Sequence, residues 1–275
     1  MEGEVRIRGT IADLGEALKD ASAATLSATG DLDASETAYQ IEGVLGYELA
    51  QWRVYDDELL VDLVPFTRVE RRFSTGDSSE EVDVLSLGAN SIFRFGIPGF
   101  GSHQIAAYPL FTTDSEADTQ IGSLNLSWFP AFRIPGDNPR FIFPNSNIDL
   151  TGFGIEGFDL HIGAEGIGEV GRVFDDGGND DISDRDSFTR VGGNIVARLS
   201  GEPGTIFSRF ALTTSYRYLF GITGEPGSSD RFEIGLSYLF PDQENFEIGL
   251  RYVNGDAEET FEEQEFWEAT LGVKF

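Results

Sequence analysis

The residues best suited to acid–base chemistry are the two histidines, His103 and His161. His161 lies two positions after Asp159, so an extended chain presents both side chains on the same face. A carboxylate beside an imidazole can orient it as a general base, which makes a hydrolase one function to consider. However, no serine or second acidic pair can be placed beside this pair from the sequence. A hydrogen-bonded structural histidine is the simpler interpretation, and we expect no enzyme activity.

A second candidate for chemistry is the acidic block DDGGNDDISDRD, residues 175–186. Its carboxylates suggest calcium, but they do not follow the alternate positions, glycine and later glutamate of an EF-hand loop. The chain has no cysteine, which excludes thiolate metal ligands, a thiol nucleophile and disulfides. We therefore expect no cofactor and interpret the block as a solvated loop. Weak divalent binding, or divalent bridging to anionic lipid headgroups, stays open.

The other charged residues lie on segments in which side chains alternate. In residues 231–240, RFEIGLSYLF, apolar residues occupy every second position, and Arg231 and Glu233 lie on the opposite face. Residues 205–219 and 245–253 alternate in the same way. A period of two is typical of a β-strand with one apolar and one polar face. Strands are therefore the elements that must position the charges.

Twelve segments of this kind predict an all-β chain. Many are about ten residues long, which suits strands that cross a bilayer at a tilt better than the shorter strands of soluble sheets. No run of 18 apolar residues predicts a transmembrane helix. The first 20 residues lack the apolar core of a signal peptide, so we expect none in this sequence. The strands are expected at 21–30, 37–49, 58–70, 82–95, 102–112, 119–130, 150–170, 187–199, 205–219, 231–240, 245–253 and 265–275.

The acidic residues are sorted between alternate connections. The net charge of −29 argues against a nucleic-acid partner, which would require a basic surface. Alternate connections of an up-and-down barrel lie at opposite ends, so one end should be acidic and carry most of the longer loops. Connection 131–147 is the exception, since it is long at the other end. The odd-numbered connections (31–36, 74–81, 112–119, 175–187, 220–230 and 254–265) hold 23 acids and one basic residue, whereas the even-numbered ones (50–57, 96–101, 131–147, 200–204 and 241–245) hold 6 acids and three arginines.

The chain ends with FWEATLGVKF, residues 266–275. Terminal residues of soluble domains usually fray. Here the apolar side chains share one face up to the last residue, which predicts that this segment is held in a sheet. The residues on that face are Trp267, Ala269, Leu271, Val273 and Phe275.

With this terminal strand and its two-ended loops, the pattern of residues 21–275 resembles Gram-negative outer-membrane β-barrel proteins of porin-like type. The resemblance implies a transmembrane antiparallel up-and-down β-barrel of about 12 strands in a bacterial outer membrane. It also implies that Trp267 and Phe275 belong to a signal read by the barrel-insertion machinery, and that membrane lipid and lipopolysaccharide surround the barrel. Aromatic residues near strand ends suit interfacial girdles, namely Tyr47, Trp52, Trp128, Phe129, Phe132, Tyr216, Tyr218, Phe220, Tyr238, Phe240 and Tyr252.

If the apolar faces meet lipid, the polar faces line the lumen. One wall should then be basic and the opposite wall acidic. Either these charges select solutes in a water-filled pore, or they pair with each other and fill the interior. The inward arginines are expected to be Arg190, Arg198, Arg209, Arg217, Arg231 and Arg251. The other inward residues are expected to be Glu42, Glu48, Asp62, Asp83, Asp159, His161 and Glu165, with Glu233, Glu247 and Glu268 among or beside the arginines.

Residues 1–20 differ from the barrel segment 21–275. EVRIRG is expected to be extended, and Ile11, Leu14 and Leu18 recur at helical spacing. We expect a short amphipathic helix at the periplasmic mouth, with a plug that enters the lumen as the alternative.

The function predicted from these observations is an outer-membrane channel for passive passage of small polar solutes. We expect cation preference, because an acidic vestibule raises the local cation concentration. The alternative is a non-conducting scaffold barrel that binds a partner protein or lipopolysaccharide.

Overall fold

The computed structural model describes most of the predicted strands. No helix in the described residues is long and apolar enough to cross a membrane. The helix predicted within residues 1–20 and the terminal Phe275 lie outside the described part of the chain. The described residues are 5–8, 11, 24–30, 37–54, 59–74, 82–97, 101–116, 118–132, 145–177, 187–202, 204–205, 207–224, 227–240, 243–256 and 263–273.

Within these residues, fifteen strands form one sheet in which every described pairing is antiparallel. Twelve of them make up the barrel wall. These are β2 (Ala24–Gly30), β3 (Thr37–Tyr47), β5 (Leu59–Ser74), β6 (Val82–Ile97), β7 (Gly101–Asp114), β8 (Thr119–Phe132), β10 (Phe158–Asp176), β11 (Ser187–Gly201), β12 (Phe210–Thr223), β13 (Ser229–Phe240), β14 (Gln243–Asp256) and β15 (Glu263–Val273).

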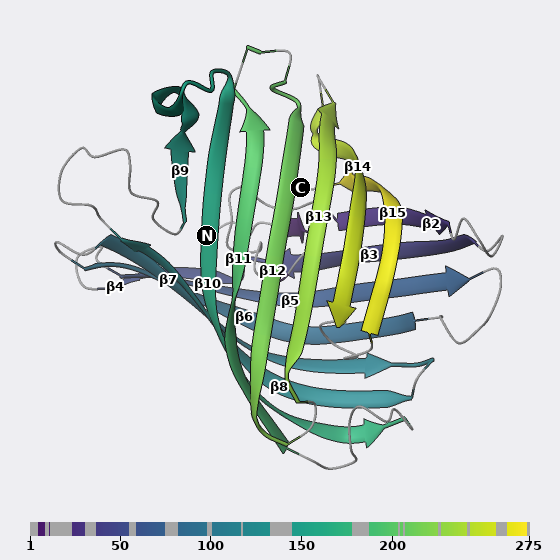
Figure 1. Cartoon of the computed structure of the whole chain (residues 1–275). Coiled ribbons are helices and arrows are strands. Elements are labelled where there is room, and N and C mark those ends of the chain that lie inside the picture. Colours follow the sequence, from purple (N-terminus) through teal and green to yellow (C-terminus); the bar gives the residue numbers. More distant parts are fainter. Residues whose placement is uncertain are drawn as a thin grey trace.

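The sheet closes on itself. The last strand, β15, pairs with β2, β2 pairs with β3, and β3 pairs with β5 at the start of the meander. From β5 to β15 each barrel strand pairs with the next in the chain, so the order is up-and-down throughout. Figure 1 shows β10–β15 crossing steeply in front of β3–β8, as the twist and tilt of a barrel require. The predicted antiparallel barrel of about 12 strands is confirmed.

Three short strands extend this wall near the end opposite the acidic connections. β1 (Val5–Arg8) pairs with Val44–Tyr47 of β3, beyond the part of β3 that pairs with β2. β4 (Ala50–Val54) continues β3 along β5 after one extra residue, which is a β-bulge. β9 (Ser146–Asp149) pairs with β10 beyond the segment that pairs with β8. The prediction that EVRIRG is extended is therefore confirmed for Val5–Arg8.

Some predicted boundaries were wrong. Connection 50–57 was expected to be irregular, but it contains β4. The strand expected from residue 150 begins at Phe158, because Leu150–Phe153 form a 3-10 turn and Gly154 and Gly157 adopt positive φ angles of 81° and 83°. The strand expected from residue 205 begins at Phe210 and continues to Thr223. Of the exceptional connection 131–147, residues 133–144 lie outside the described part.

The two faces of the wall have opposite chemistry. On β15, Trp267 is 56% exposed on the outside, whereas the neighbouring Glu268 is 1% exposed on the inside. On β11, Val191 is 43% exposed and the neighbouring Arg190 is 1% exposed. Water-soluble proteins bury apolar side chains and rarely leave a continuous apolar surface. This barrel has the reverse arrangement, with apolar residues outside and charged residues inside.

Asn145 forms hydrogen bonds at the junction where β9 takes over from β8 as the neighbour of β10. Its side-chain Nδ2 donates to the carbonyl oxygens of Pro130 (2.7 Å) and Ala164 (2.9 Å), and its Oδ1 accepts from the Ala164 amide (3.2 Å). Its backbone has a positive φ of 59°, a conformation that asparagine tolerates better than most residues. The side chain thus satisfies backbone groups that the sheet ladder leaves without a strand partner at this junction.

This junction can be tested with Asn145→Gly and Asn145→Ala. The glycine variant keeps the backbone conformation but loses the side-chain hydrogen bonds, which should cost about 1–3 kcal/mol of unfolding free energy. The alanine variant should be lower still, by about 1 kcal/mol, because alanine disfavours positive φ. Thermal unfolding of detergent-solubilised protein measures both, with Asn147→Ala as control. If both variants were as stable as the wild type, the hydrogen bonds of Asn145 would contribute nothing to the unfolding free energy.

Candidate functional site

The interior of the barrel contains a polar cavity of about 190 Å³. Uncharged polar side chains of β7 and β8 form part of its lining, including Thr112, Ser123, Asn125 and Ser127. Charged side chains of both signs form much of the remainder. They are Glu42, Arg68, Glu70, Glu165, Glu169, Arg217, Arg231, Glu233 and Arg251.

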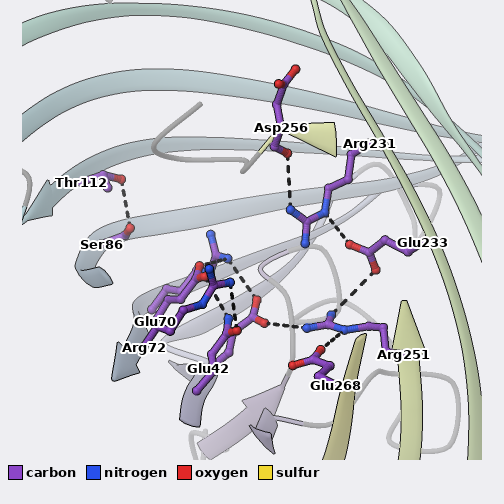
Figure 2. Close-up of polar contacts among 12 residues, drawn as sticks. Glu42, Glu70, Arg72, Ser86, Thr112, Arg231, Glu233, Arg251, Asp256 and Glu268 are labelled. Atoms are coloured by element: carbon purple, nitrogen blue, oxygen red, sulfur yellow. Dashed lines mark hydrogen bonds and ion pairs between the residues drawn. The ribbon is translucent and has the colours of Figure 1, made fainter. Parts of the chain in front are cut away.

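On the β3–β5 wall of the cavity, one arginine binds two carboxylates. Arg68 Nη2 lies 3.1 Å from Glu42 and 3.2 Å from Glu70. Gln40 donates to Glu70 (2.9 Å) and accepts from Arg72 (3.3 Å), which extends the chain of contacts towards the acidic end. Figure 2 shows Glu42, Glu70 and Arg72 of this group close together. Such pairing lowers the cost of holding charges away from bulk water.

Arg251, on β14, links this wall to the strands on the other side of the closing seam. It ion-pairs with Glu268 on β15, lies 3.8 Å from Glu233 on β13, and lies 3.4 Å from Glu42 on β3. The contact with Glu42 spans β2 and β15, the strands whose pairing closes the barrel. Arg231 continues the network by donating to Glu233 (2.5 Å) and to the carbonyl oxygen of Asp256 (3.4 Å), as Figure 2 shows. A continuous set of ion pairs therefore crosses the closing seam from the inside.

Further round the barrel, Arg190 and Glu169 form a pair that is almost fully buried. Arg190 Nη2 and Nε donate to Glu169 at 2.5 and 3.0 Å, and Nη1 donates to Ser229 Oγ at 3.1 Å. The two side chains are 1% and 7% exposed. They are direct cross-strand partners in the β10–β11 register, which explains why they meet.

A separate polar cluster lies near the end opposite the acidic connections. Asp62 accepts from Gln51 on β4 (3.0 Å) and ion-pairs with Arg94 on β6. Arg94 also donates to Gln104 (2.9 Å). At the same end, Arg6 on β1 ion-pairs with Glu48, which fastens the N-terminal strand to the wall.

Between these polar zones lies an apolar cluster that includes Ile11 from the N-terminal segment. Ile11 is 7% exposed and packs with inward side chains of β3, β5, β6 and β7, namely Val44, Val64, Phe66, Ile92 and Ala106. Asn90 Nδ2 donates to the Ile11 carbonyl oxygen at 3.3 Å, and Ile11 also lines the cavity. Ile11 therefore lies inside the barrel. The predicted helix at the mouth falls outside the described residues.

The structure places most of the predicted lumen residues on inward faces. Of these, Glu42, Glu165, Arg217, Arg231, Glu233 and Arg251 meet at the cavity. Arg198 and Glu247 share the inward faces of β11 and β14 but are not part of its lining. Asp159 shares the face of Glu165 on β10. Whether these residues line a conducting pore stays a prediction.

Several placements were wrong. Asp83 alternates with the buried Val84 and therefore faces outwards, where it lies 3.5 Å from Arg71 at the acidic end. Arg209 is a different case: it lies just before β12 begins, and its place in the lumen stays a prediction. Phe129 was expected in an outer girdle but packs inwards against the Ile11 cluster.

The division into a basic and an acidic wall was also wrong. Arg68 and Arg94 lie in the wall that was expected to be acidic, and both are paired with its carboxylates. Opposite charges are adjacent because each inward charge in a confined lumen is stabilised by a close partner of the other sign.

The two histidines lie on opposite faces. His161 faces inwards and its Nδ1 donates to Asn147 Oδ1 (2.9 Å). His103 faces outwards, is 5% exposed, and lies between the rings of Phe95, Trp128 and Phe132, with centroids 5.6, 6.1 and 5.6 Å away. Among the described residues there is no group of three or more histidine, aspartate or glutamate side chains that could hold a metal ion.

Sequence reasoning missed Arg68, Glu70 and Glu169, although a signal for each was present. Arg68 and Glu70 follow Asp62 at even intervals on the predicted strand 58–70, so they had to share its inward face. Glu169 follows Glu165 by the same rule. In contrast, nothing in the alternation indicated that Arg251 would reach Glu42 across two strands.

Arg251 can be tested with Arg251→Met. This change leaves Glu268, whose side chain is 0% exposed, without its guanidinium partner. The expected loss of unfolding free energy is about 3–5 kcal/mol, as for other broken buried pairs. Adding Glu268→Gln should restore part of that loss, because it removes the isolated charge.

Thermal unfolding in detergent compares these variants with Arg172→Met, which removes an exposed arginine from the outer face of β10. If Arg251→Met were as stable as Arg172→Met, the network would not stabilise the seam.

Comparisons with known proteins add only distant likenesses. No protein-family model and no curated protein matches the sequence. Among solved structures, the chain is similar to an outer membrane channel from Pseudomonas putida F1, with 13% identity, 99% of this chain and 94% of that chain covered, and a TM-score of 0.45. It is also similar to the transport unit of the autotransporter AIDA-I from Escherichia coli (11% identity, 100% and 90% covered, TM-score 0.43) and to the KdgM porin (8% identity, 91% and 99% covered, TM-score 0.37). Likenesses this weak carry no inference about what this chain binds or transports.

Proposed function

We propose that this chain is an outer-membrane channel through which small polar solutes pass passively. The observation that carries the proposal is the polar cavity of about 190 Å³ inside a closed barrel whose outer face is apolar. A closed sheet with an apolar exterior suits hydrocarbon, because every strand then has a neighbour on both sides. A lumen lined by hydroxyl, amide and charged groups suits hydrated solutes better than apolar ones.

The same proposal places the barrel in a bacterial outer membrane, surrounded by lipid and lipopolysaccharide. Outward aromatic side chains near strand ends support this placement, since aromatic girdles lie at membrane interfaces. Trp267 is outward, and its ring centroid lies 4.9 Å from that of Tyr252. We also propose that Trp267 and Phe275 are part of the signal that the barrel-insertion machinery recognises.

We further propose that the channel prefers cations. The up-and-down strand order assigns all six acid-rich connections to the same end of the barrel. A mouth that carries most of the chain's loop carboxylates concentrates cations and repels anions within about a Debye length of roughly 10 Å. The lumen arginines do not oppose this strongly where they are paired, as Arg68, Arg190 and Arg251 are.

A non-conducting scaffold barrel is the second candidate. It is favoured by the ion pairs along the inner wall and by Ile11, which occupies part of the lumen. In that case the lumen would be filled, and a partner protein or lipopolysaccharide would bind the outer surface or the loops.

Single-channel recording separates the two candidates. The refolded protein is inserted into a planar bilayer between potassium chloride solutions of different concentration. Discrete current steps with a cation-selective reversal potential are expected. A correctly folded barrel that inserts but carries no current would overturn the channel proposal, and an anion-selective reversal potential would overturn the cation preference.

The acidic end is tested by neutralising one of its loops. Replacing Asp180, Asp181, Asp184 and Asp186 with asparagine should move the reversal potential towards zero, more at low than at high salt, because salt screens exposed charges. The matched control replaces four acids of the other connections, Asp56, Asp57, Asp137 and Asp242, in the same way. Equal shifts in the two variants would contradict a vestibule at one end.

Ile11 offers a test of whether a side chain from the N-terminal segment restricts the path through the lumen. Ile11→Asp places a carboxylate in an apolar cluster, where its charge is costly without a partner. The segment should leave the cluster and single-channel conductance should rise. Ile11→Leu keeps the apolar contact and serves as the control with unchanged conductance. A conductance of Ile11→Asp equal to that of Ile11→Leu would mean that the segment does not restrict the path.

A further inference from the structure

We propose that the outer face of β10 holds a binding site for a phosphate group of lipid A, the membrane-embedded part of lipopolysaccharide. Arg172 supplies the charge of this site, and an apolar surface lies beside it. The side chains of that surface are Phe111, Leu124, Val170 and Phe174. This inference rests on the proposed placement of the barrel in a bacterial outer membrane, and it does not depend on whether the lumen conducts.

Arg172 is a charged side chain on the lipid side of the wall, close to the acidic end. It is exposed, it follows the outward Val170 by two positions, and it lies three residues before connection 175–187 begins. At about 3.3 Å a residue, its backbone lies roughly 10 Å from the start of that connection. In the proposed orientation this is near the boundary between hydrocarbon and headgroups, where a long arginine side chain turns its guanidinium towards the headgroups.

The strand register gives Arg172 no carboxylate partner. Its cross-strand neighbours are Gly122 on β8 and Ser187 on β11. Among the described residues, the Arg172 side chain has no ion pair and no hydrogen bond, and its guanidinium carbon lies 6.0 Å from the ring centroid of Phe174. The five N–H donors of this guanidinium are therefore free to bind a ligand.

Arg71 is the contrasting case at the same end of the barrel. It faces outwards on β5, but its cross-strand neighbour on β6 is Asp83, and Arg71 Nη2 lies 3.5 Å from that carboxylate. The exposed Asp175, three residues after Arg172 on β10, accepts from the Gly177 amide (3.2 Å) instead. An arginine that faces lipid without an internal counter-ion is expected to pair with an anionic group of the membrane.

The apolar part of the site spans the neighbouring strands β7, β8 and β10. The Phe174 ring lies over Gly122, where even an added Cβ atom would be 2.9 Å from it, and approaches Phe111 on β7, with ring centroids 6.2 Å apart. Leu124 and Val170 are direct cross-strand neighbours and continue this surface away from the acidic end. All four apolar side chains are about half exposed. Acyl chains can pack against this surface while a phosphate contacts the arginine.

Lipid A matches both parts of the site. A phosphate monoester carries up to two negative charges and can accept two parallel hydrogen bonds from a guanidinium. The acyl chains belong to the same molecule, so one lipid can contact the arginine and the apolar surface together. A free phosphate ion has no apolar part, and the phosphodiester of a phospholipid carries a single charge. The longer, acidic connections of the barrel are expected on the outer side of the membrane, in the leaflet that contains lipopolysaccharide.

The charge of the acidic end makes a fixed cation important here. The odd-numbered connections hold 23 acidic residues, which repel phosphate groups around most of this end. A phosphate can approach this end either through a guanidinium on the wall or through divalent ions that bridge two anions. The free guanidinium of Arg172 favours direct contact, and a chelator separates the two cases.

Native mass spectrometry of the folded barrel in detergent tests this site. The probes are diphosphoryl lipid A, the same lipid with both phosphates removed, phosphatidylglycerol and inorganic phosphate, each with EDTA present. The wild-type protein is expected to bind diphosphoryl lipid A about fivefold more tightly than the dephosphorylated form, the factor for one partly solvated ion pair. Phosphatidylglycerol and inorganic phosphate are expected to bind more weakly than diphosphoryl lipid A.

The variant Arg172→Gln should remove this fivefold preference. Arg172→Lys should keep only part of it, because lysine retains the charge but not the two parallel donors. The matched control, Arg71→Gln, removes an outward arginine that is already paired with Asp83 and should leave the preference unchanged. Heat-dependent migration on gels checks the folding of each variant, and Arg172→Lys serves as the test if Arg172→Gln does not fold.

Each of the other outcomes overturns a stated part of the inference. An equal preference in wild type and Arg172→Gln would overturn the site, since the arginine would then only reach water. A preference that appears only when magnesium replaces EDTA would also overturn it, because divalent ions would hold the phosphate. Phosphatidylglycerol that binds as tightly as lipid A, or inorganic phosphate that displaces lipid A at equal concentration, would overturn the assignment to lipid A.

The channel proposal is judged separately. Potassium chloride conductance without an Arg172-dependent preference would overturn the lipid site and leave the channel intact. An Arg172-dependent preference in a barrel that carries no current would overturn the channel and leave the lipid site intact.

Discussion

The constraint on which this structure depends is that every backbone amide and carbonyl in a sheet needs a partner, most strictly in hydrocarbon. The pairing of β15 with β2, β2 with β3, and β3 with β5 meets that constraint by removing both sheet edges. Where one strand cannot supply the partner, something else does. β1 takes the place of β2 beside β3 at one end of the barrel. Asn145 supplies side-chain hydrogen-bonding groups where β9 takes over from β8.

Closure also dictates the chemistry of the interior. With apolar faces outside, the inward faces hold most of the charged groups of the wall, in a space too small for bulk water to solvate all of them. Charges of opposite sign are therefore paired, and Arg251 alone forms ion pairs with Glu42, Glu233 and Glu268. These pairs connect neighbouring strands of the wall from the inside.

Much of the fold could be predicted from the sequence, because alternation is a local property. A period of two identifies strands and faces, and it was sufficient for the twelve-stranded barrel and for the inward side of residues such as Arg190 and Glu165. Alternation did not predict contacts that depend on how the strands are arranged in three dimensions. The reach of Arg251 to Glu42 depends on closure, and the contact of Ile11 with Val64 and Ile92 depends on where the N-terminal segment enters. Asp83 was misplaced because polarity was equated with the inside, whereas a charge near a strand end can face outwards into water or headgroups.

The seam has a consequence for how the protein is made. β2 pairs with residues Glu268 to Val273, so the first and last barrel strands of the chain are neighbours. Contacts between residues so distant in sequence form late, since almost the whole chain must be ordered before they can be made. Until then, β14 or β15 on one side and β2 on the other present bare edges that invite pairing with other chains. The nascent protein is therefore most prone to aggregate just before completion, and a copy truncated before β15 has no way to hide those edges.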